Sequence, residues 1–255
     1  MVSVRKRIKP LYLIVKRSLL KFIVRSATGW TLPQYSNVII VAPHPDDEIL
    51  GLGGFILQQL KKGGKVSVLY LTDGEASLAD IDDDAVRAMR IRLSNEVLGR
   101  LGISDDRIFR FHLADGSIPR KNTEGFDDAA AEIQQIFSSL MPDAVFVTHP
   151  QETWPYDHIA AFELADAAIH KTAFSCDFYG YWVWLWYSMP FKSCIRINWN
   201  AVTAVAISDE LTNKKELIDI YLRLLAPNGK PWSGVLPKAM TDAFGYPYEV
   251  VEKIK

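Results

Sequence analysis

Residues 38–48 read VIIVAPHPDDE, an apolar run that ends in a histidine and three carboxylates. The β-favouring residues 38–42, followed by two prolines in close succession, predict a short buried strand and then a fixed loop. The acidic cluster would therefore lie at the C-terminal edge of a sheet, where open α/β sheets bind ligands. Adjacent carboxylates are costly to desolvate, and a divalent cation held by His44 and Asp47 would remove that cost. The alternative is that the acids only cap a helix that begins near Glu48.

A second stretch repeats this pattern far along the chain. Residues 143–150 read DAVFVTHP, and the pair Asp157-His158 then opens an apolar helical segment at 159–169. His158 would lie on the first turn of that helix and face the strand ends. Asp157 could accept the second ring N–H of His158, as carboxylates do beside metal-bound histidines. A histidine at such a place can also be an ordinary surface residue.

Together these residues resemble the PIG-L/LmbE family of zinc-dependent de-N-acetylases, whose signature is a strand ending in H-P-D-D-E and a distant histidine in a D-H pair. The resemblance implies that His44, Asp47 and His158 bind Zn²⁺, and that Asp46 is the general base toward a metal-activated water. Three protein ligands leave one coordination position open, as in catalytic zinc sites. The same ligand set also accepts Fe²⁺, cobalt or nickel.

The resemblance extends over most of the chain and implies that Arg90 and Asp115 contact the sugar. Each could instead be a surface ion-pair partner. Two positions depart from the family pattern. A glutamate often found three residues after the arginine is Leu93 here, and a histidine that assists the oxyanion, three residues before the metal-binding histidine, is Pro155. His149 is the nearest candidate by sequence for that oxyanion role.

The alternation of apolar runs and helical patterns predicts the fold class. Strand-like runs occur at 38–42, 66–71, 107–111 and 143–147, and helical patterns occur near 49–62, 84–101, 127–140 and 158–170. This order predicts one α/β domain over residues 29–255, with a Rossmann-like, mostly parallel sheet flanked by helices. A chain of 255 residues with 49% hydrophobic content can bury a core of that size.

The C-terminal part of the chain changes in composition. The aromatic run at 179–187 predicts a buried strand whose ends could offer stacking surfaces to a sugar ring. A further strand is predicted at 201–207 and a helix at about 209–225. Residues 226–248 predict an ordered loop that helps to wall the cleft. The glycines of residues 51–54 do not form G-x-G-x-x-G and indicate close helix packing.

Residues 1–28 predict a basic amphipathic helix. Residues 1–25 contain eight basic residues and no acid, so this segment carries about +8 and the rest of the chain about −9. Charges interrupt its apolar run, which argues against a transmembrane span. The helix could lie on an anionic membrane or pack on the acidic body of its own protein. Its apolar residues recur at helical spacing and are Leu11, Ile14, Val15, Leu19, Phe22 and Ile23.

We therefore predict a zinc-dependent hydrolase that removes the N-acetyl group from an N-acetylated amino sugar. The expected substrate is a GlcNAc-type glycoconjugate of glycan biosynthesis, linked to a lipid or a nucleotide, and the expected location is the cytoplasm or the cytoplasmic face of the membrane. Alternatives are a deacetylase of small soluble glycoconjugates and a metal-dependent sugar-binding or scaffold protein without catalysis. Nucleic-acid binding is not expected, because basic and aromatic residues are not interleaved around the cleft.

Overall fold

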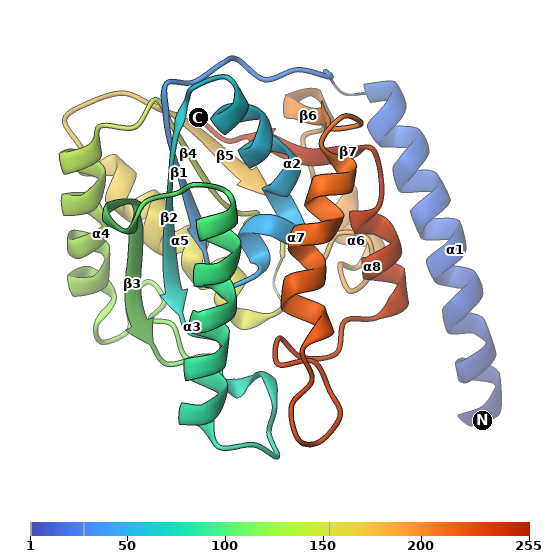
Figure 1. Ribbon diagram of the computed structural model, residues 1–255. Coiled ribbons are helices and arrows are strands. Elements are labelled where there is room, and N and C mark those ends of the chain that lie inside the picture. The colour runs from blue at the N-terminus through green and yellow to red at the C-terminus, as the bar shows by residue number, and fades with distance from the viewer. Residues whose placement is uncertain (1, 28, 153) are drawn as a thin grey trace.

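A seven-stranded sheet forms the centre of the molecule (Figure 1). The structure is a computed structural model that describes the backbone of residues 2–27, 29–152 and 154–255, and the side chains of these residues except for positions 2–10 and 27. The strands are β1 (Asn37–Ala42), β2 (Lys65–Thr72), β3 (Ile108–Leu113), β4 (Ala144–Thr148), β5 (Asp177–Tyr181), β6 (Val202–Ala206) and β7 (Tyr248–Lys253).

The order of the strands is β3-β2-β1-β4-β5-β7-β6. Strands β1 to β5 pair in parallel, and only β7 runs antiparallel to its neighbours β5 and β6. The predicted mostly parallel, Rossmann-like sheet is confirmed. After β1 the chain builds outward through β2 and β3, then returns to place β4 on the other side of β1. The loops after β1 and β4 therefore separate to opposite faces, which creates the crevice where such sheets bind ligands.

Helices cover both faces of this sheet (Figure 1). Successive residues of β1 point to opposite faces, so that Val38 and Ile40 join one core cluster and Ile39 and Val41 join the other. Helices α2, α3 and α7 pack on the first face, and α4 and α5 on the second. The helices are α1 (Val2–Ala27), α2 (Asp47–Lys61), α3 (Asp83–Arg100), α4 (Phe126–Leu140), α5 (Tyr156–His170), α6 (Phe191–Cys194), α7 (Leu211–Arg223) and α8 (Lys238–Phe244).

Close packing explains two of the glycines in α2. A Cβ atom at Gly51 would lie 2.4 Å from the ring of Tyr181, and one at Gly54 would lie 2.5 Å from the side chain of Ile207. Both distances are shorter than any real carbon contact, so a side chain at either position would push the helix off the sheet. The glycines thus let α2 approach the sheet closely and set the position of its N-terminus.

The C-terminal part departs from the sequence predictions in two places. The aromatic run at 179–187 is strand only as far as Tyr181, because the chain then turns at residues 182–189. The region 226–248, predicted to be a loop, contains α8, and β7 follows it directly. Strand β7 is difficult to predict because it contains glutamates, which are rarely buried in a sheet. Glu249 is buried because Lys214 Nζ donates to it at 2.6 Å.

Helix α1 lies along the edge of the molecule that carries β6 and α8 (Figure 1). Two ends of the predicted N-terminal segment, residues 1 and 28, lie outside the described residues, as do the side chains of Arg5, Lys6, Arg7 and Lys9. Within the described residues, no helix combines the length and the apolar character that crossing a membrane requires.

Candidate metal centre

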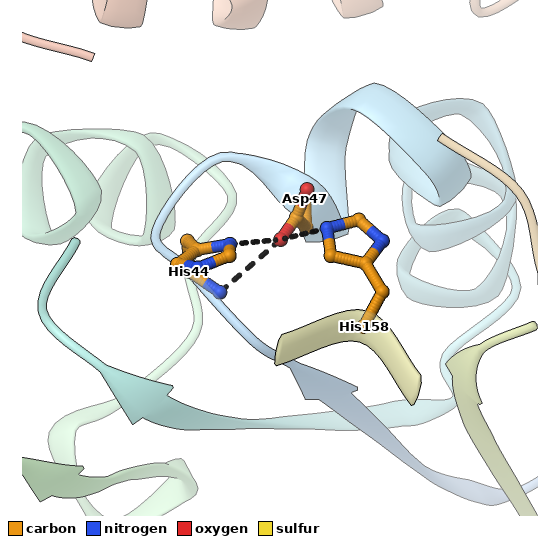
Figure 2. A group of neighbouring side chains, drawn as sticks. All are labelled: His44, Asp47 and His158. Carbon is orange, nitrogen blue, oxygen red and sulfur yellow. Dashed lines mark hydrogen bonds and ion pairs between the residues drawn. The ribbon is translucent and has the colours of Figure 1, made fainter. Parts of the chain in front are cut away.

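The three predicted ligands come together at the crevice between β1 and β4 (Figure 2). His44 lies in the loop after β1, Asp47 is the first residue of α2, and His158 belongs to the first turn of α5. Asp47 Oδ2 lies 3.0 Å from His44 Nδ1 and 3.4 Å from His158 Nε2. One ligand atom from each residue lies within 4.8 Å of the other two. The three side chains are therefore close enough to bind one ion.

The buried ring of His158 tests whether a cation fits this place. Its Nδ1 lies 2.8 Å from Glu152 Oε2, whereas its Nε2 faces Asp47 and has no hydrogen-bond partner among the described residues. A buried, unpaired ring nitrogen is costly unless something binds it. Two imidazole nitrogens and a carboxylate oxygen are donors that suit zinc and other divalent transition metals. The residues present thus fit a metal ion.

Two further carboxylates hold the other side of the His44 ring. Its Nε2 lies 3.1 Å from Asp115 Oδ1 and 3.2 Å from Asp157 Oδ2. Burial alone would lower the pKa of His44, but Asp115, Asp157 and Asp47 raise this pKa well above its ordinary value. Since Nδ1 faces Asp47 and His158, Nε2–H donates to the pair of carboxylates. Asp115 and Asp157 therefore orient the ring so that Nδ1 points to the centre.

The hydrogen-bond partner predicted for the ring of His158 is wrong. Asp157 was predicted to accept its second ring N–H, but Glu152 does so, and Asp157 contacts His44 instead. Neighbouring side chains on a helix point about 100° apart. The carboxylate of Asp157 is therefore directed at the ring of His44 and away from the ring of His158. Glu152 is fully buried, and its other oxygen accepts the backbone N–H groups of residues 183, 184 and 185 at 2.5–3.0 Å.

Asp46 lies at the edge of this centre in an unusual backbone conformation. It precedes α2 with φ of 131°, a value that residues with a side chain rarely adopt, and its side chain does not cap the helix. The capping alternative therefore does not account for it. Burial, together with the nearby Asp47 and Glu48, raises the pKa of Asp46 to about 8, although Arg90 opposes the shift. This value applies to the metal-free protein, and a cation bound beside Asp46 would lower the pKa and favour the carboxylate form that accepts a proton.

Arg90 and Asp115, the predicted sugar contacts, both reach the same cavity as Asp46. Arg90 is buried in α3, and its Nη2 donates to Pro45 O at 2.6 Å and to Asp46 Oδ2 at 3.2 Å. Its Nε has no hydrogen-bond partner among the described residues. Asp115 accepts the N–H of Ala76 at 2.9 Å in addition to contacting His44. Neither residue is an exposed ion-pair partner.

His149, the predicted oxyanion residue, does not join this group. Its Nε2 lies 2.7 Å from Glu252 Oε2, and its Nδ1 accepts the N–H of Gln151 at 3.1 Å. The ring is buried and stacks on Trp182 with centroids 4.1 Å apart. Both ring nitrogens are thus engaged, and His149 is not among the described residues that line the cavity.

The cavity above the centre has a volume of about 360 Å³. Its floor is polar and contains the three predicted ligands with Asp46, Arg90 and Asp115. Its walls are largely apolar, and residues 233–236 and Met240 contribute to them, so the predicted role of the region 226–248 as a wall is confirmed. Trp154 and Val235 line it and are 60% and 68% exposed, which places them at the rim. The rings of Trp154 and Trp184 meet edge to face at 4.8 Å.

Glu152 beside the centre was not predicted from the sequence, and the role of the buried Glu48 was not predicted either. Glu152 could have been suspected, because it lies between two histidines that follow a predicted strand end. Glu48 is the last residue of the stretch VIIVAPHPDDE, yet its hydrogen-bond partners could not be inferred from the sequence. Its carboxylate accepts the N–H of Asp46 at 2.9 Å and the hydroxyl of Tyr221 at 2.5 Å. Glu48 thereby ties the strained residue Asp46 to α7.

Fold and site together define a Rossmann-like α/β protein with a candidate divalent-metal centre at its strand ends. Comparison with known families agrees with this class. The model of the PIG-L family, described as GlcNAc-PI de-N-acetylase, matches residues 39–169, which is just over half of the chain. The chain belongs to the PIG-L family.

A curated relative has a similar sequence over part of its length. The chain is 26% identical over 158 residues to a 1D-myo-inositol 2-acetamido-2-deoxy-alpha-D-glucopyranoside deacetylase of Rhodococcus erythropolis, and the match covers 54% of each protein. Two relatives from Corynebacterium glutamicum with the same description are 27% identical over 160 residues. The chain thus spans about half the length of the curated relatives it matches.

Two solved structures share the fold at low sequence identity. An N,N'-diacetylchitobiose deacetylase from Pyrococcus horikoshii has 21% identity and a TM-score of 0.59, with 80% of this chain and 77% of that chain covered. A 4-carboxy-2-hydroxymuconate hydratase from Pseudomonas putida has 16% identity and a TM-score of 0.64, with 86% and 96% covered. Since a deacetylase and a hydratase both adopt this fold, chemistry has to be argued from the site.

Proposed function

We propose that this protein is a metal-dependent amide hydrolase that removes the N-acetyl group from an N-acetylated amino sugar of the GlcNAc type. The observation that carries the proposal is the juxtaposition of His158 Nε2 with Asp47 and His44 in a cavity that also contains Asp46. This nitrogen is buried and has no hydrogen-bond partner within the described part of the chain. Membership of the PIG-L family and the deacetylase names of the relatives support the same class of reaction.

His44, Asp47 and His158 would hold the metal, and Zn²⁺ is the ion we propose. When bound, such an ion supplies Lewis-acid chemistry, which polarises an amide carbonyl and makes water a better nucleophile. The buried supports of the two histidines keep their ring nitrogens directed at this position. Each ring is fixed by a carboxylate on its other nitrogen, Glu152 for His158 and the Asp115–Asp157 pair for His44.

Asp46 would act as general base and then as general acid. It accepts the proton of the attacking water while the water oxygen forms a bond to the acyl carbon. It returns that proton to the amide nitrogen as the C–N bond breaks, so that acetate and the free amino sugar leave. Support comes from its place in the cavity and from its contact with Arg90, which keeps the carboxylate oriented. Arg90 also lines the cavity, which supports its proposed second role toward a sugar hydroxyl.

The cavity supports a glycoconjugate better than a free small amide. Trp154 and Trp184 present aromatic faces and edges at the mouth, and such side chains commonly stack on sugar rings. The exposed Val235, which lines the same cavity, could contact an apolar group attached to the sugar. We propose a cytoplasmic location. Both cysteines, Cys176 and Cys194, are unpaired, as is usual in reducing compartments.

One observation favours a sugar-binding protein without catalysis. Pro155 replaces the expected oxyanion-assisting histidine and lines the cavity, while His149 is engaged elsewhere. Among the described lining residues, the only histidines are the two candidate metal ligands. If an imidazole donor to the oxyanion is indispensable, binding would occur here without turnover.

Acetate release from a panel of N-acetylglucosamine conjugates separates these two functions. The metal-loaded protein, the Asp46→Asn variant and a chelator-treated sample are assayed side by side, with bound metal measured for each. Hydrolysis is supported if release occurs and falls by about 10²-fold or more in Asp46→Asn while its metal content is unchanged. Stoichiometric metal without release from any conjugate supports the binding protein. Asp47→Asn serves as the contrast, because it should lose metal as well as release.

A further inference from the structure

Helix α1 uses one face to attach to the body of the protein. Leu20 and Val24 are fully buried against an apolar cluster that includes Trp182, Met189 and Cys194. Lys16 is also buried, and its Nζ donates to the backbone oxygens of residues 189 and 187 at 2.5 and 3.2 Å. The alternative that this basic helix packs on its own protein is therefore correct for this face.

The opposite face of α1 is apolar and exposed. Leu11, Ile14, Val15 and Phe22 are between 58% and 68% exposed, and Leu19 beside them is 38% exposed. With 3.6 residues per turn, these side chains form a stripe directed away from Leu20 and Val24. We call these five residues the outer stripe of α1. A helix that faces only water carries polar residues there, so a contiguous apolar stripe indicates a surface that something covers.

The charge of α1 indicates what covers it. The helix has no acidic residue, and the chain segment 1–25 carries about +8. Lys21 and Arg25 flank the outer stripe, and Arg196 is exposed near the helix, two residues beyond Cys194 of the shared cluster. The same short segment exposes Ile195 to 69%. Apolar side chains bordered by cations match the acyl region and the headgroups of an anionic bilayer.

A second copy of this chain fits the outer stripe less well. Pairing two copies through it would bring two segments of about +8 together, which costs electrostatic energy at ordinary salt. An anionic surface instead attracts the basic residues of the helix that are not buried against the protein. From the apolar stripe and its basic border, we infer that α1 binds the protein peripherally to an anionic lipid bilayer, with the outer stripe inserted among the lipids.

The direction of α1 relates this surface to the cavity. In Figure 1 the N-terminal end of α1 lies toward the same end of the molecule as the C-terminal end of β2, and the candidate metal centre is at the C-terminal edge of the sheet. The N-terminal end of the helix and the edge of the sheet that carries the candidate metal centre are thus on the same side. A bilayer that binds this end would lie near the cavity, which fits a substrate carried by a lipid. This last step rests on the proposed function, whereas membrane binding itself does not.

Flotation with vesicles tests the inference on the full chain. We expect the protein to float with vesicles of phosphatidylcholine and phosphatidylglycerol and to stay behind with phosphatidylcholine alone. The combined variant Leu11→Ser, Val15→Ser and Phe22→Ser should bind at least about tenfold more weakly, because binding scales with the apolar area inserted. A matched control replaces three apolar residues that are exposed elsewhere, Met141→Ser, Leu224→Ser and Leu225→Ser, and should bind as the parent does.

Charge is tested separately with Lys21→Glu and Arg25→Glu, which leave the outer stripe intact. This variant should lose most of its preference for anionic vesicles, and 0.5 M salt should have the same effect on the parent protein. Equal flotation of the parent and the stripe variant overturns the inference. It is also overturned if light scattering shows that the parent is a dimer and that the stripe variant is a monomer, since a second copy then covers the stripe. Circular dichroism and thermal unfolding verify that the variants fold.

Discussion

Glu152 Oε2 lies 2.8 Å from Nδ1 of the buried His158, and the other oxygen of the same carboxylate accepts three backbone N–H groups in the turn after β5. The turn thus keeps a fully buried carboxylate in place, and the carboxylate fixes which nitrogen of His158 faces Asp47. The aromatic segment 182–185, which is far from the signature residues in sequence, thereby positions a proposed metal ligand.

Replacing Glu152 by glutamine should weaken metal binding without abolishing the fold. The amide keeps the size of the side chain but loses the charge that raises the basicity of His158, so we expect about 10- to 100-fold lower metal affinity. Competition with a chromogenic chelator measures this affinity. Glu132→Gln on the exposed face of α4 is the matched control and should bind metal as the parent does. An unchanged affinity in Glu152→Gln would show that the contact with His158 has no influence on the metal.

Metal binding should strengthen as pH rises. Burial alone would lower the pKa of His158, but the facing carboxylates of Asp47 and Glu152 raise this pKa to about 9 in the metal-free protein. Protonated His158 therefore stabilises the metal-free fold below pH 6.5, and this contribution is lost as pH rises through about 9. A cation has to displace that proton, so its affinity increases over the same interval.

Thermal unfolding from pH 6 to 8.5, with and without Zn²⁺, checks the pH dependence. The increase in Tm caused by the metal should grow with pH, and calorimetry in buffers of different ionisation enthalpy should detect proton release on binding. His158→Gln, which lacks the titrating group, should bind weakly at every pH. A metal-induced increase in Tm that shrinks toward pH 8.5 would contradict the proposed ionisation of His158.

The signature residues could be predicted from the sequence because their placement is local. Pro43 to Asp47 follow a strand directly, and the C-terminal ends of parallel strands share one edge of the sheet. The second histidine could be placed because an apolar run and a helical pattern enclose it in the sequence. The PIG-L resemblance and the Rossmann-like sheet rest on these same segments, and both are confirmed.

The supporting residues could not be predicted because their roles depend on distant parts of the chain. Glu152 is held in place by the turn after β5. Asp115 reaches His44 because β3 pairs with β2, which brings the loop after β3 to the same edge of the sheet. Strand β7 was missed for a related reason. Its buried Glu249 is tolerable only because Lys214 on α7 and the N–H groups of two α2 residues satisfy its carboxylate. No pattern within residues 248–253 reveals those partners.

The close approach of α2 to the sheet predicts opposite effects of alanine at two glycines. Gly51→Ala should lower the free energy of unfolding by about 1–3 kcal/mol, because its Cβ would overlap the buried ring of Tyr181. Gly99→Ala in the exposed last turn of α3 meets no atom within 4 Å and should raise stability by about 0.5–1 kcal/mol. Urea unfolding measures both. Equal effects of the two variants would mean that α2 does not pack as closely as described.

Trp154 at the rim of the cavity should determine how tightly the sugar binds. The side chain is 60% exposed, so its removal leaves the core intact, yet it lines the cavity next to Trp184. An aromatic contact contributes about 0.5–1.5 kcal/mol beyond its buried area, so Trp154→Ala should raise KM roughly tenfold. Because the ring is largely exposed at the rim whereas Asp46 is buried, we expect the ring to bind substrate and transition state equally, and kcat should change by less than about twofold. Trp154→Phe keeps an aromatic face and should restore most of the loss. Steady-state kinetics on the glycoconjugate that is hydrolysed fastest measures both constants. A fall in kcat at constant KM would mean that Trp154 acts in the chemical step and does not contribute to sugar binding.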